Sequence, residues 1–287
     1  PMPDANTPFW IGDDHNLRAR DGTVEARDVV KDPRALRPDV IVIHYTAGAS
    51  ATSSADSLAD PQVKASAHLV VGRAGELIQV TPFDKVAWHA GRSEYTFADG
   101  QVRRGFNDFS IGIEIDNAGE LTPALDGHHT WFGRTVPPHE VIKAVHRNES
   151  QPKFWHAYTH EQIAMVQEIC RALVAHYGIR HILGHEEISP RRKTDPGPAF
   201  PLDRLRSTVL GANRRDDAEV DLLPLGGTVT ASRLNIRAGA SAGSPKVALP
   251  LEQGAPVVAL REQEGWYYVR AQVEGWVDGR HVDLHQE

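Results

Sequence analysis

The stretch that decides how this chain is organised runs from Gly184 to Pro198 and reads GHEEISPRRKTDPGP. Its three prolines fix φ and remove backbone donors, so no helix can run through the segment and its shape is restricted. The loop carries an imidazole at His185, an ammonium at Lys193 and a carboxylate at Asp195. A rigid loop with these groups suits a metal site or an acid–base site, and a surface loop with a salt bridge is the alternative.

Two β-branched runs predict the central strands of a sheet. Residues 40–43, Val-Ile-Val-Ile, are typical of a buried strand, and they end at His44. A His at the end of a central strand points toward a cleft, unless it only caps the strand edge. Residues 110–115 form the second run and enclose Glu114 between isoleucines. A carboxylate there needs a partner or a function, because desolvation raises its pKa toward the range of a general base.

The remaining pattern mixes strands and helices. Thr159 to Tyr177 is the clearest helix, with apolar residues at helical spacing, a capping box and Gly178 as its stop. Cys170 lies on the apolar stripe of this helix and is therefore assigned to the core. Further expected elements are a short helix within 50–64, strands at 67–71, 77–80 and 179–183, and a closing helix around 202–209. The fold class is therefore α/β, with a mixed central β-sheet flanked by helices.

Composition divides the chain into four parts. We predict an N-terminal extension at 1–38 with little core, a catalytic domain at 39–211, a linker at 212–226 and a small all-β domain at 227–287. Residues 121–158 contain four prolines and are expected to be an irregular functional insertion. After the linker no helical period appears; strands are expected at 228–231, 234–237, 256–261, 266–270 and 275–277, which suits a small barrel.

Composition also limits the function. The net charge of −7 and the pI near 6.1 argue against nucleic acid as the partner. No apolar run approaches the roughly 20 residues that span a bilayer. The single Cys170 excludes an internal disulfide and a multi-cysteine zinc cluster, whereas fifteen His suggest metal or acid–base chemistry. No signal peptide is visible, and the start at Pro1-Met2 is compatible with a removed export signal.

If the strands form one sheet, the polar groups at their ends can converge: His44, Glu114, His185, Lys193 and Asp195. Two imidazoles and one carboxylate make a catalytic zinc set, in which the fourth position is open for water. Zinc lowers the pKa of that water to about 7, and a nearby carboxylate can take its proton. Lys193 would stabilise the oxyanion of an attacked carbonyl.

Five motifs, in order between about Val40 and Leu210, resemble the type 2 N-acetylmuramoyl-L-alanine amidases, which share their fold with the peptidoglycan recognition proteins. The motifs are His44-Tyr45-Thr46-Ala47, Ala67-His68-Leu69-Val70, Ala87-Trp88-His89-Ala90-Gly91, residues 107–115 (NDFSIGIEI) and residues 185–197 (HEEISPRRKTDPG). The resemblance implies Zn²⁺ held by His44, His185 and Asp195, with Glu114 as general base and Lys193 as oxyanion stabiliser. It also implies that His68 and His89 line the substrate cleft, and we count Trp88 with them. The long segment 121–156 departs from compact members of the family.

The implied reaction is hydrolysis of the amide between N-acetylmuramic acid and L-alanine in peptidoglycan or its fragments. A non-catalytic peptidoglycan receptor on the same fold and a cytosolic amidase that recycles anhydro-muropeptides are the alternatives. The filled ligand positions favour the enzyme. The implied location is the cell envelope, periplasmic or secreted.

The C-terminal part resembles a bacterial SH3-like domain. The resemblance rests on residues 234–239 (LNIRAG), 265–269 (GWYYV) and 274–277 (EGWV). Such domains commonly bind cell-wall peptides, for which Trp266 and Trp276 offer aromatic faces. The alternative is that at least one of these tryptophans belongs to the core of a very small barrel.

Overall fold

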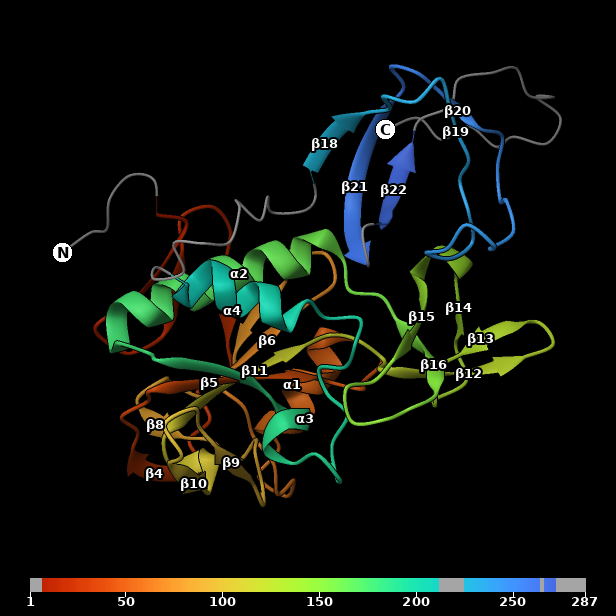
Figure 1. Cartoon of the computed structure of the whole chain (residues 1–287). Helices are drawn as coiled ribbons and strands as arrows, with labels where there is room; N and C mark the ends of the chain where they lie inside the picture. The colour runs from red at the N-terminus through yellow and green to blue at the C-terminus, as the bar shows by residue number, and fades with distance from the viewer. Residues whose placement is uncertain (1–6, 212–224, 264–265, 272–287) are drawn as a thin grey trace, which may run out of the picture. The chain divides into compact units, whose positions relative to one another are not determined.

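The computed structural model describes residues 7–211, 225–263 and 266–271 (Figure 1). The chain divides into two compact units, Pro1–Arg214 and Arg215–Glu287. The first unit contains all the residues that the sequence assigns to catalysis.

A six-stranded mixed sheet lies at the centre of the first unit. Its order is β17 (His181–Gly184), β5 (Val40–Tyr45), β11 (Ser110–Ile115), β6 (Leu69–Val71), β7 (Leu77–Gln79) and β3 (Val24–Ala26). The first four strands run parallel, β7 is antiparallel to β6, and β3 is parallel to β7. The predicted mixed sheet with flanking helices is confirmed.

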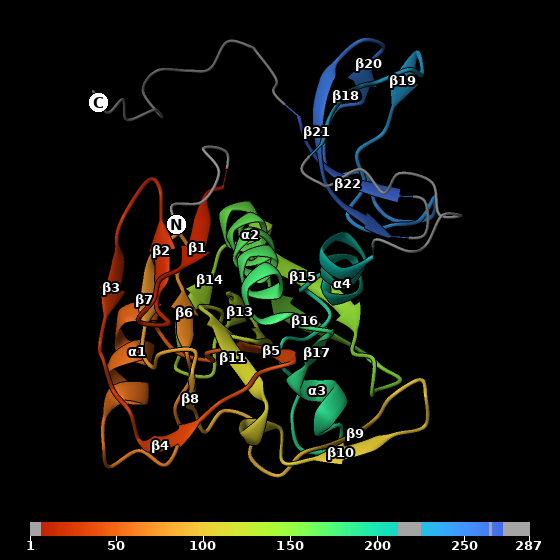
Figure 2. The ribbon, with the colours of Figure 1, turned by 90° about the vertical axis from the view of Figure 1, so that its left-hand side faces the viewer.

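Helices cover both faces of this sheet (Figures 1 and 2). The long helix α2 (His160–Tyr177) packs Val166 and Ile169 against Ile41 and Ile113 of the sheet. The other α-helices among the described residues of this unit are α1 (Ala51–Ala59), α3 (His185–Ile188) and α4 (Leu202–Leu210). Thr159 and Gln162 form the predicted capping box of α2, and Gly178 follows it at φ 69°. The sequence predicts this helix because the capping box and the glycine satisfy backbone N–H and C=O groups that have no partner within the helix.

Strand periodicity decides which side chains share a face. Odd-numbered residues of β5 and β11, such as Ile43 and Ile113, face α2. Alternate residues point to opposite faces of a sheet, so His44 and Glu114 lie on the face away from α2. The register also pairs Glu114 with His44 across the two strands. Two of the predicted catalytic groups are therefore neighbours.

The N-terminal residues contribute to this core. β1 (Phe9–Ile11) pairs with β2 (Leu17–Ala19), β4 (Asp32–Ala35) pairs with β8 (Lys85–Val86), and β3 joins the central sheet. Phe9, Ile11, Leu17 and Leu36 are buried in the main hydrophobic cluster. The expectation that residues 1–38 have little core is therefore wrong for the described residues 7–38. Its strands are too short to give a recognisable apolar run.

The insertion is also regular, contrary to expectation. It forms a five-stranded antiparallel sheet of β14 (Thr135–Val136), β13 (Gly127–His129), β12 (Glu120–Ala124), β16 (Pro152–His156) and β15 (Val141–Val145). Leu121 and Val136 are buried in a small hydrophobic cluster of its own. Pro152 is the first residue of β16, a position at which the missing N–H is tolerated. A short hairpin, β9 (Glu94–Thr96) and β10 (Val102–Arg104), lies elsewhere in the unit.

The described part of the second unit is built of strands. β18 (Leu225–Thr228), β21 (Pro256–Gln263) and β22 (Trp266–Ala271) form an antiparallel sheet, and β19 (Arg233–Leu234) pairs with β20 (Leu251–Glu252). The strands expected at 256–261 and 266–270 are confirmed, whereas those expected at 228–231 and 234–237 are wrong in position, since the strands there are β18 and β19. The strand expected at 275–277, Trp276 and linker residues 212–224 lie outside the described residues. Among the described helices, none has the length and apolarity needed to cross a membrane.

Candidate metal centre and active site

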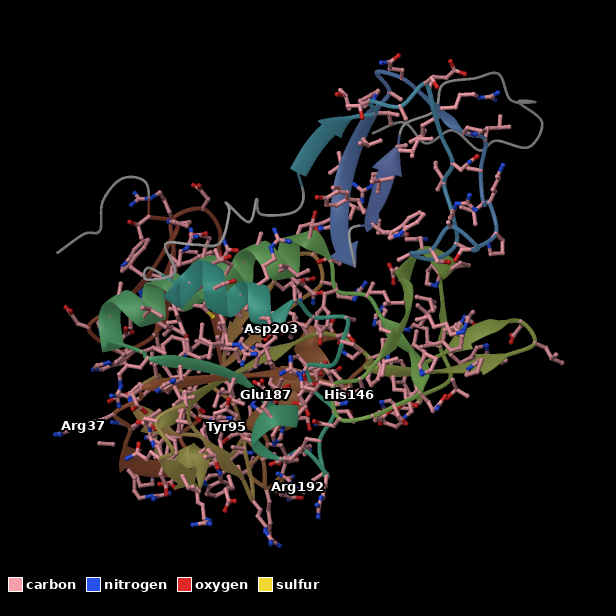
Figure 3. All side chains as sticks on the ribbon, in the orientation of Figure 1. Arg37, Tyr95, His146, Glu187, Arg192 and Asp203 are labelled. Atoms are coloured by element: carbon pink, nitrogen blue, oxygen red, sulfur yellow. The ribbon has the colours of Figure 1, made fainter. Side chains whose placement is uncertain are left out.

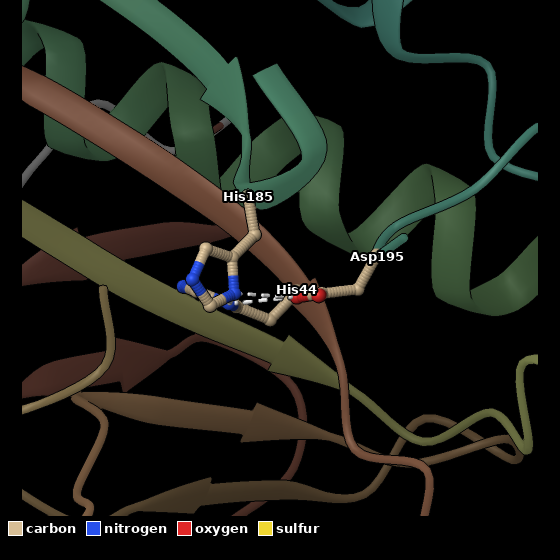
Figure 4. A group of neighbouring side chains, drawn as sticks. All are labelled: His44, His185 and Asp195. Carbon is tan, nitrogen blue, oxygen red and sulfur yellow. Dashed lines mark hydrogen bonds and ion pairs between the residues drawn. The ribbon is translucent and has the colours of Figure 1, made fainter. Parts of the chain in front are cut away.

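Three predicted ligands converge at one point (Figure 4). His44 comes from the end of β5, His185 from the start of α3 and Asp195 from the following loop. The Nδ1 atoms of the two imidazoles are 3.0 Å apart, and Oδ2 of Asp195 lies 2.9 Å from Nδ1 of His44 and 3.0 Å from Nδ1 of His185. All three side chains are buried. The structure thus joins residues that are up to 151 positions apart.

Backbone and side-chain hydrogen bonds hold the two ends of the 184–198 loop together. The N–H of Glu186 donates to the carbonyl of Asp195 at 2.8 Å. The N–H of Gly197 donates to Oε2 of Glu186 at 3.0 Å, and the Tyr158 hydroxyl donates to the carbonyl of Pro196 at 2.6 Å. These bonds hold His185 and Asp195 next to each other, although they are ten positions apart in the sequence.

The chemistry of the three atoms fits a divalent cation. Nε2 of His185 lies 3.1 Å from the carbonyl oxygen of Ala90, which can only accept, so this nitrogen donates and Nδ1 keeps its lone pair. Burial, followed by the neighbouring His185, lowers the pKa of His44 to about 4, so this ring is neutral at pH 7. In a tetrahedral zinc site with bonds near 2.0–2.1 Å the ligand atoms lie about 3.3 Å apart. The observed triangle is close to that spacing.

Glu114 and Lys193 lie beside the three candidate ligands. Oε2 of Glu114 is buried and has no hydrogen-bond partner among the described residues. Burial and then the charge of Asp195 raise the pKa of Glu114 well above its usual value, whereas the positive charge of Lys193 lowers it. Lys193 is half-buried in the same loop as Asp195. The structure therefore brings together all five residues that the sequence selected.

The three residues predicted to contact substrate have different surroundings. His68 is fully buried, with Nδ1 accepting from the N–H of Gly112 at 3.0 Å and Nε2 donating to the carbonyl of Lys85 at 2.9 Å. His89 is buried, and its Nδ1 lies 2.9 Å from Nε2 of His44. Trp88 is partly buried, and its Nε1 donates to Asp32 at 3.2 Å. Contact with substrate stays a prediction for these residues.

Sequence reasoning missed the groups through which the insertion reaches the site. His146, labelled in Figure 3, is buried and lies 2.6 Å from Oε2 of Glu186 through its Nε2. Nε1 of Trp131 donates to the carbonyl of Ala47 at 2.6 Å, three residues after His44, and 72% of this Trp is exposed. Only the pairing of distant segments reveals these contacts, because no local spacing links them.

Comparisons of the sequence with known proteins point to one enzyme family. Residues 34–198 match the family described as N-acetylmuramoyl-L-alanine amidase. The chain is 31% identical over 217 residues to a protein from Salmonella typhimurium strain SL1344 named 1,6-anhydro-N-acetylmuramyl-L-alanine amidase AmpD, covering 67% of this chain and 95% of that one. It is 31% identical over 185 residues to the N-acetylmuramoyl-L-alanine amidase AmiD of Escherichia coli K12, covering 61% of this chain and 55% of that one.

Among solved structures, the complex of AmiD from E. coli with anhydro-N-acetylmuramic acid-L-Ala-D-gamma-Glu-L-Lys is 25% identical, covers 70% of this chain and 65% of that chain, and has a TM-score of 0.42. The family match spans more than half of the sequence and includes every one of the five clustered residues. This chain therefore belongs to the N-acetylmuramoyl-L-alanine amidases, the enzymes that hydrolyse the amide between N-acetylmuramic acid and L-alanine.

Proposed function

We propose that the chain is a zinc-dependent amidase in which His44, His185 and Asp195 hold the metal. The observation that carries this proposal is the buried triangle of two Nδ1 atoms and one carboxylate oxygen, with sides of 2.9–3.0 Å. Three acceptor atoms this close are unfavourable unless a proton or a cation lies between them. When bound, zinc supplies a Lewis acid that acidifies water and polarises a carbonyl.

In this proposal Glu114 transfers the proton and Lys193 stabilises the negative charge that develops during the reaction. Glu114 takes a proton from the attacking water and passes it to the departing nitrogen of L-alanine. Water adds its oxygen to the lactyl carbonyl carbon, the C–N bond breaks, and a carboxylate and an amine result. Lys193 stabilises the negative charge that develops on the carbonyl oxygen. The buried Oε2 of Glu114, which has no hydrogen-bond partner among the described residues, supports its role as the base.

The substrate class that we propose is a muropeptide, either within peptidoglycan or as a soluble fragment. We propose the cell envelope as the place of action, and a bacterial SH3-like fold with a wall-binding role for the C-terminal unit. Exposed Trp266 and Tyr267 on β22 support a binding role. Recycling of soluble anhydro-muropeptides is the second candidate, which the likeness to proteins named for that substrate favours. Release from sacculi compared with release from soluble fragments separates the two.

Replacing Glu114 with Gln tests the proposed mechanism. Glu114→Gln keeps the shape of the side chain but removes its basicity, so kcat on a soluble muropeptide should fall about 10²–10⁴-fold. Zinc content, measured by elemental analysis, should stay near one ion per chain, because Glu114 is not a proposed ligand. The matched control is Glu161→Gln, on an exposed position of α2, which should keep full activity. Normal turnover in Glu114→Gln would refute the assignment.

A further inference from the structure

A chain of hydrogen bonds leads from His44 to the backbone of β11. Nε2 of His89 lies 3.2 Å from the carbonyl oxygen of Ser110 and 3.3 Å from its hydroxyl oxygen. That hydroxyl donates its own proton to the carbonyl of Phe106, so both atoms of Ser110 act as acceptors toward His89. Nε2 of His89 therefore carries the proton.

This arrangement fixes the protonation of the next ring. A neutral His89 with its proton on Nε2 has a lone pair on Nδ1, which lies 2.9 Å from Nε2 of His44. Nε2 of His44 must then donate, which leaves the lone pair of His44 on Nδ1. That atom is the one that faces His185 and Asp195.

The protein builds a place for the ring of His89. A Cβ on Gly112 would lie 2.4 Å from Cγ of His89, so only glycine at this position of β11 lets the ring approach the strand. The side chain of Asn107 accepts from the N–H groups of His89 and Ala90, at 3.0 Å and 2.7 Å. The carbonyl of Ala90 in turn accepts from Nε2 of His185 at 3.1 Å.

We propose that His89 is a positioning residue that fixes the tautomer and orientation of His44 for metal binding. The adjacent Ala90 does the same for His185 through its carbonyl, so one two-residue segment orients both imidazoles. Hydrogen bonds of this kind raise the basicity of a ligand, and their loss typically weakens metal binding about 10–100-fold. The inference rests on the proposed ligand role of His44, and a contact of His89 with substrate stays a separate prediction.

The test measures zinc affinity of the metal-free protein by competition with a chelator. His89→Leu removes the acceptor and should weaken zinc binding about 10–100-fold. His89→Asn places an amide oxygen near the position of Nδ1 and should bind zinc within about threefold of the wild type. The matched control is His156→Asn, a second buried His, whose ring bonds the N–H of Ala118 and the carboxylate of Glu140; its zinc affinity should also stay within about threefold.

A second readout does not depend on any variant folding. In the zinc-bound wild-type protein, ¹⁵N NMR of the His44 ring should report a proton on Nε2 and the metal on Nδ1. Zinc on Nε2 of His44 overturns the proposal, as does a folded His89→Leu with unchanged affinity or an equal loss in His156→Asn. If the wild type binds no zinc, the proposed function itself fails, whereas zinc binding without the His89 effect removes only this inference.

Discussion

His68 shows at the scale of one residue how burial controls charge. Both of its ring nitrogens serve backbone groups, Gly112 on one side and Lys85 on the other. Burial lowers the pKa of His68 to about 4. Its usual value of about 6.5 applies in the unfolded chain, so the unfolded state takes up the proton first as pH falls.

The lowered pKa of His68 should make the folded protein less stable in acid. The contribution of His68 to the free energy of unfolding is fully present above pH 6.5. It decreases as the pH falls from 6.5 toward 4, and the free energy does not change further on account of His68 below pH 4. A pKa shift of this size corresponds to roughly 3 kcal/mol of the free energy of unfolding. The free energy of unfolding of the metal-free protein, measured in urea between pH 7 and pH 4, should therefore fall more steeply in the wild type than in His68→Asn. Parallel pH profiles for the two proteins would contradict the prediction.

At the scale of elements, the insertion supports the ligand loop. His146, between β15 and β16, bonds Oε2 of Glu186 and stacks on Trp155 at a ring distance of 5.6 Å. Nε of Arg147 pairs with Oε1 of the same carboxylate at 2.9 Å. Glu186 also accepts from Gly197 in the loop that carries Asp195. Glu187 and Asp203, labelled in Figure 3, extend this network through further contacts of Arg147.

Removing His146 should therefore weaken both the fold and the metal site. His146→Ala deprives a buried carboxylate of one partner, and we expect the free energy of unfolding to fall by about 2–4 kcal/mol. Zinc affinity should fall as well, because Asp195 lies in the supported loop. The control is His139→Ala, an exposed position in the same insertion, for which a change below about 0.5 kcal/mol is expected. A denaturant titration that places both variants at the wild-type midpoint would rule out this supporting role.

At the scale of the whole molecule, the two units have separate tasks in our proposal. All five clustered residues and the main hydrophobic cluster belong to the unit Pro1–Arg214. In our proposal the hydrolytic residues all come from this unit, and the second unit sets affinity for the cell wall. Two linked binding modules raise the effective concentration of each other on an extended polymer.

Truncation after residue 214 tests this separation. The shortened chain should hydrolyse a soluble muropeptide within about twofold of the full chain, because all five residues of the proposed site lie before residue 214. Its binding to purified sacculi, measured by sedimentation, should be at least about tenfold weaker, since one of two binding modules is lost. Equal sedimentation of the two proteins would exclude a wall-binding role for the second unit, and loss of soluble turnover would contradict the independence of the site.

The sequence by itself determined the elements with strong local signals. The apolar runs that form β5 and β11 and the capped amphipathic α2 could be recognised because each pattern satisfies its own backbone and buries one face. The five site residues were found through motifs in which His44, Glu114, His185, Lys193 and Asp195 stand at fixed places. The strands of the N-terminal residues and of the insertion escaped notice because short strands are defined by their partners.

Only the tertiary structure decided how these parts meet. The register that sets Glu114 beside His44, the ring of His89 over Gly112 and the bond from His146 to Glu186 all join segments distant in sequence. Such contacts depend on strand pairing and on the space left by packed side chains, and no local pattern of residues records either. The sequence thus named the groups to which we assign the chemistry, and the fold set their proximity and orientation.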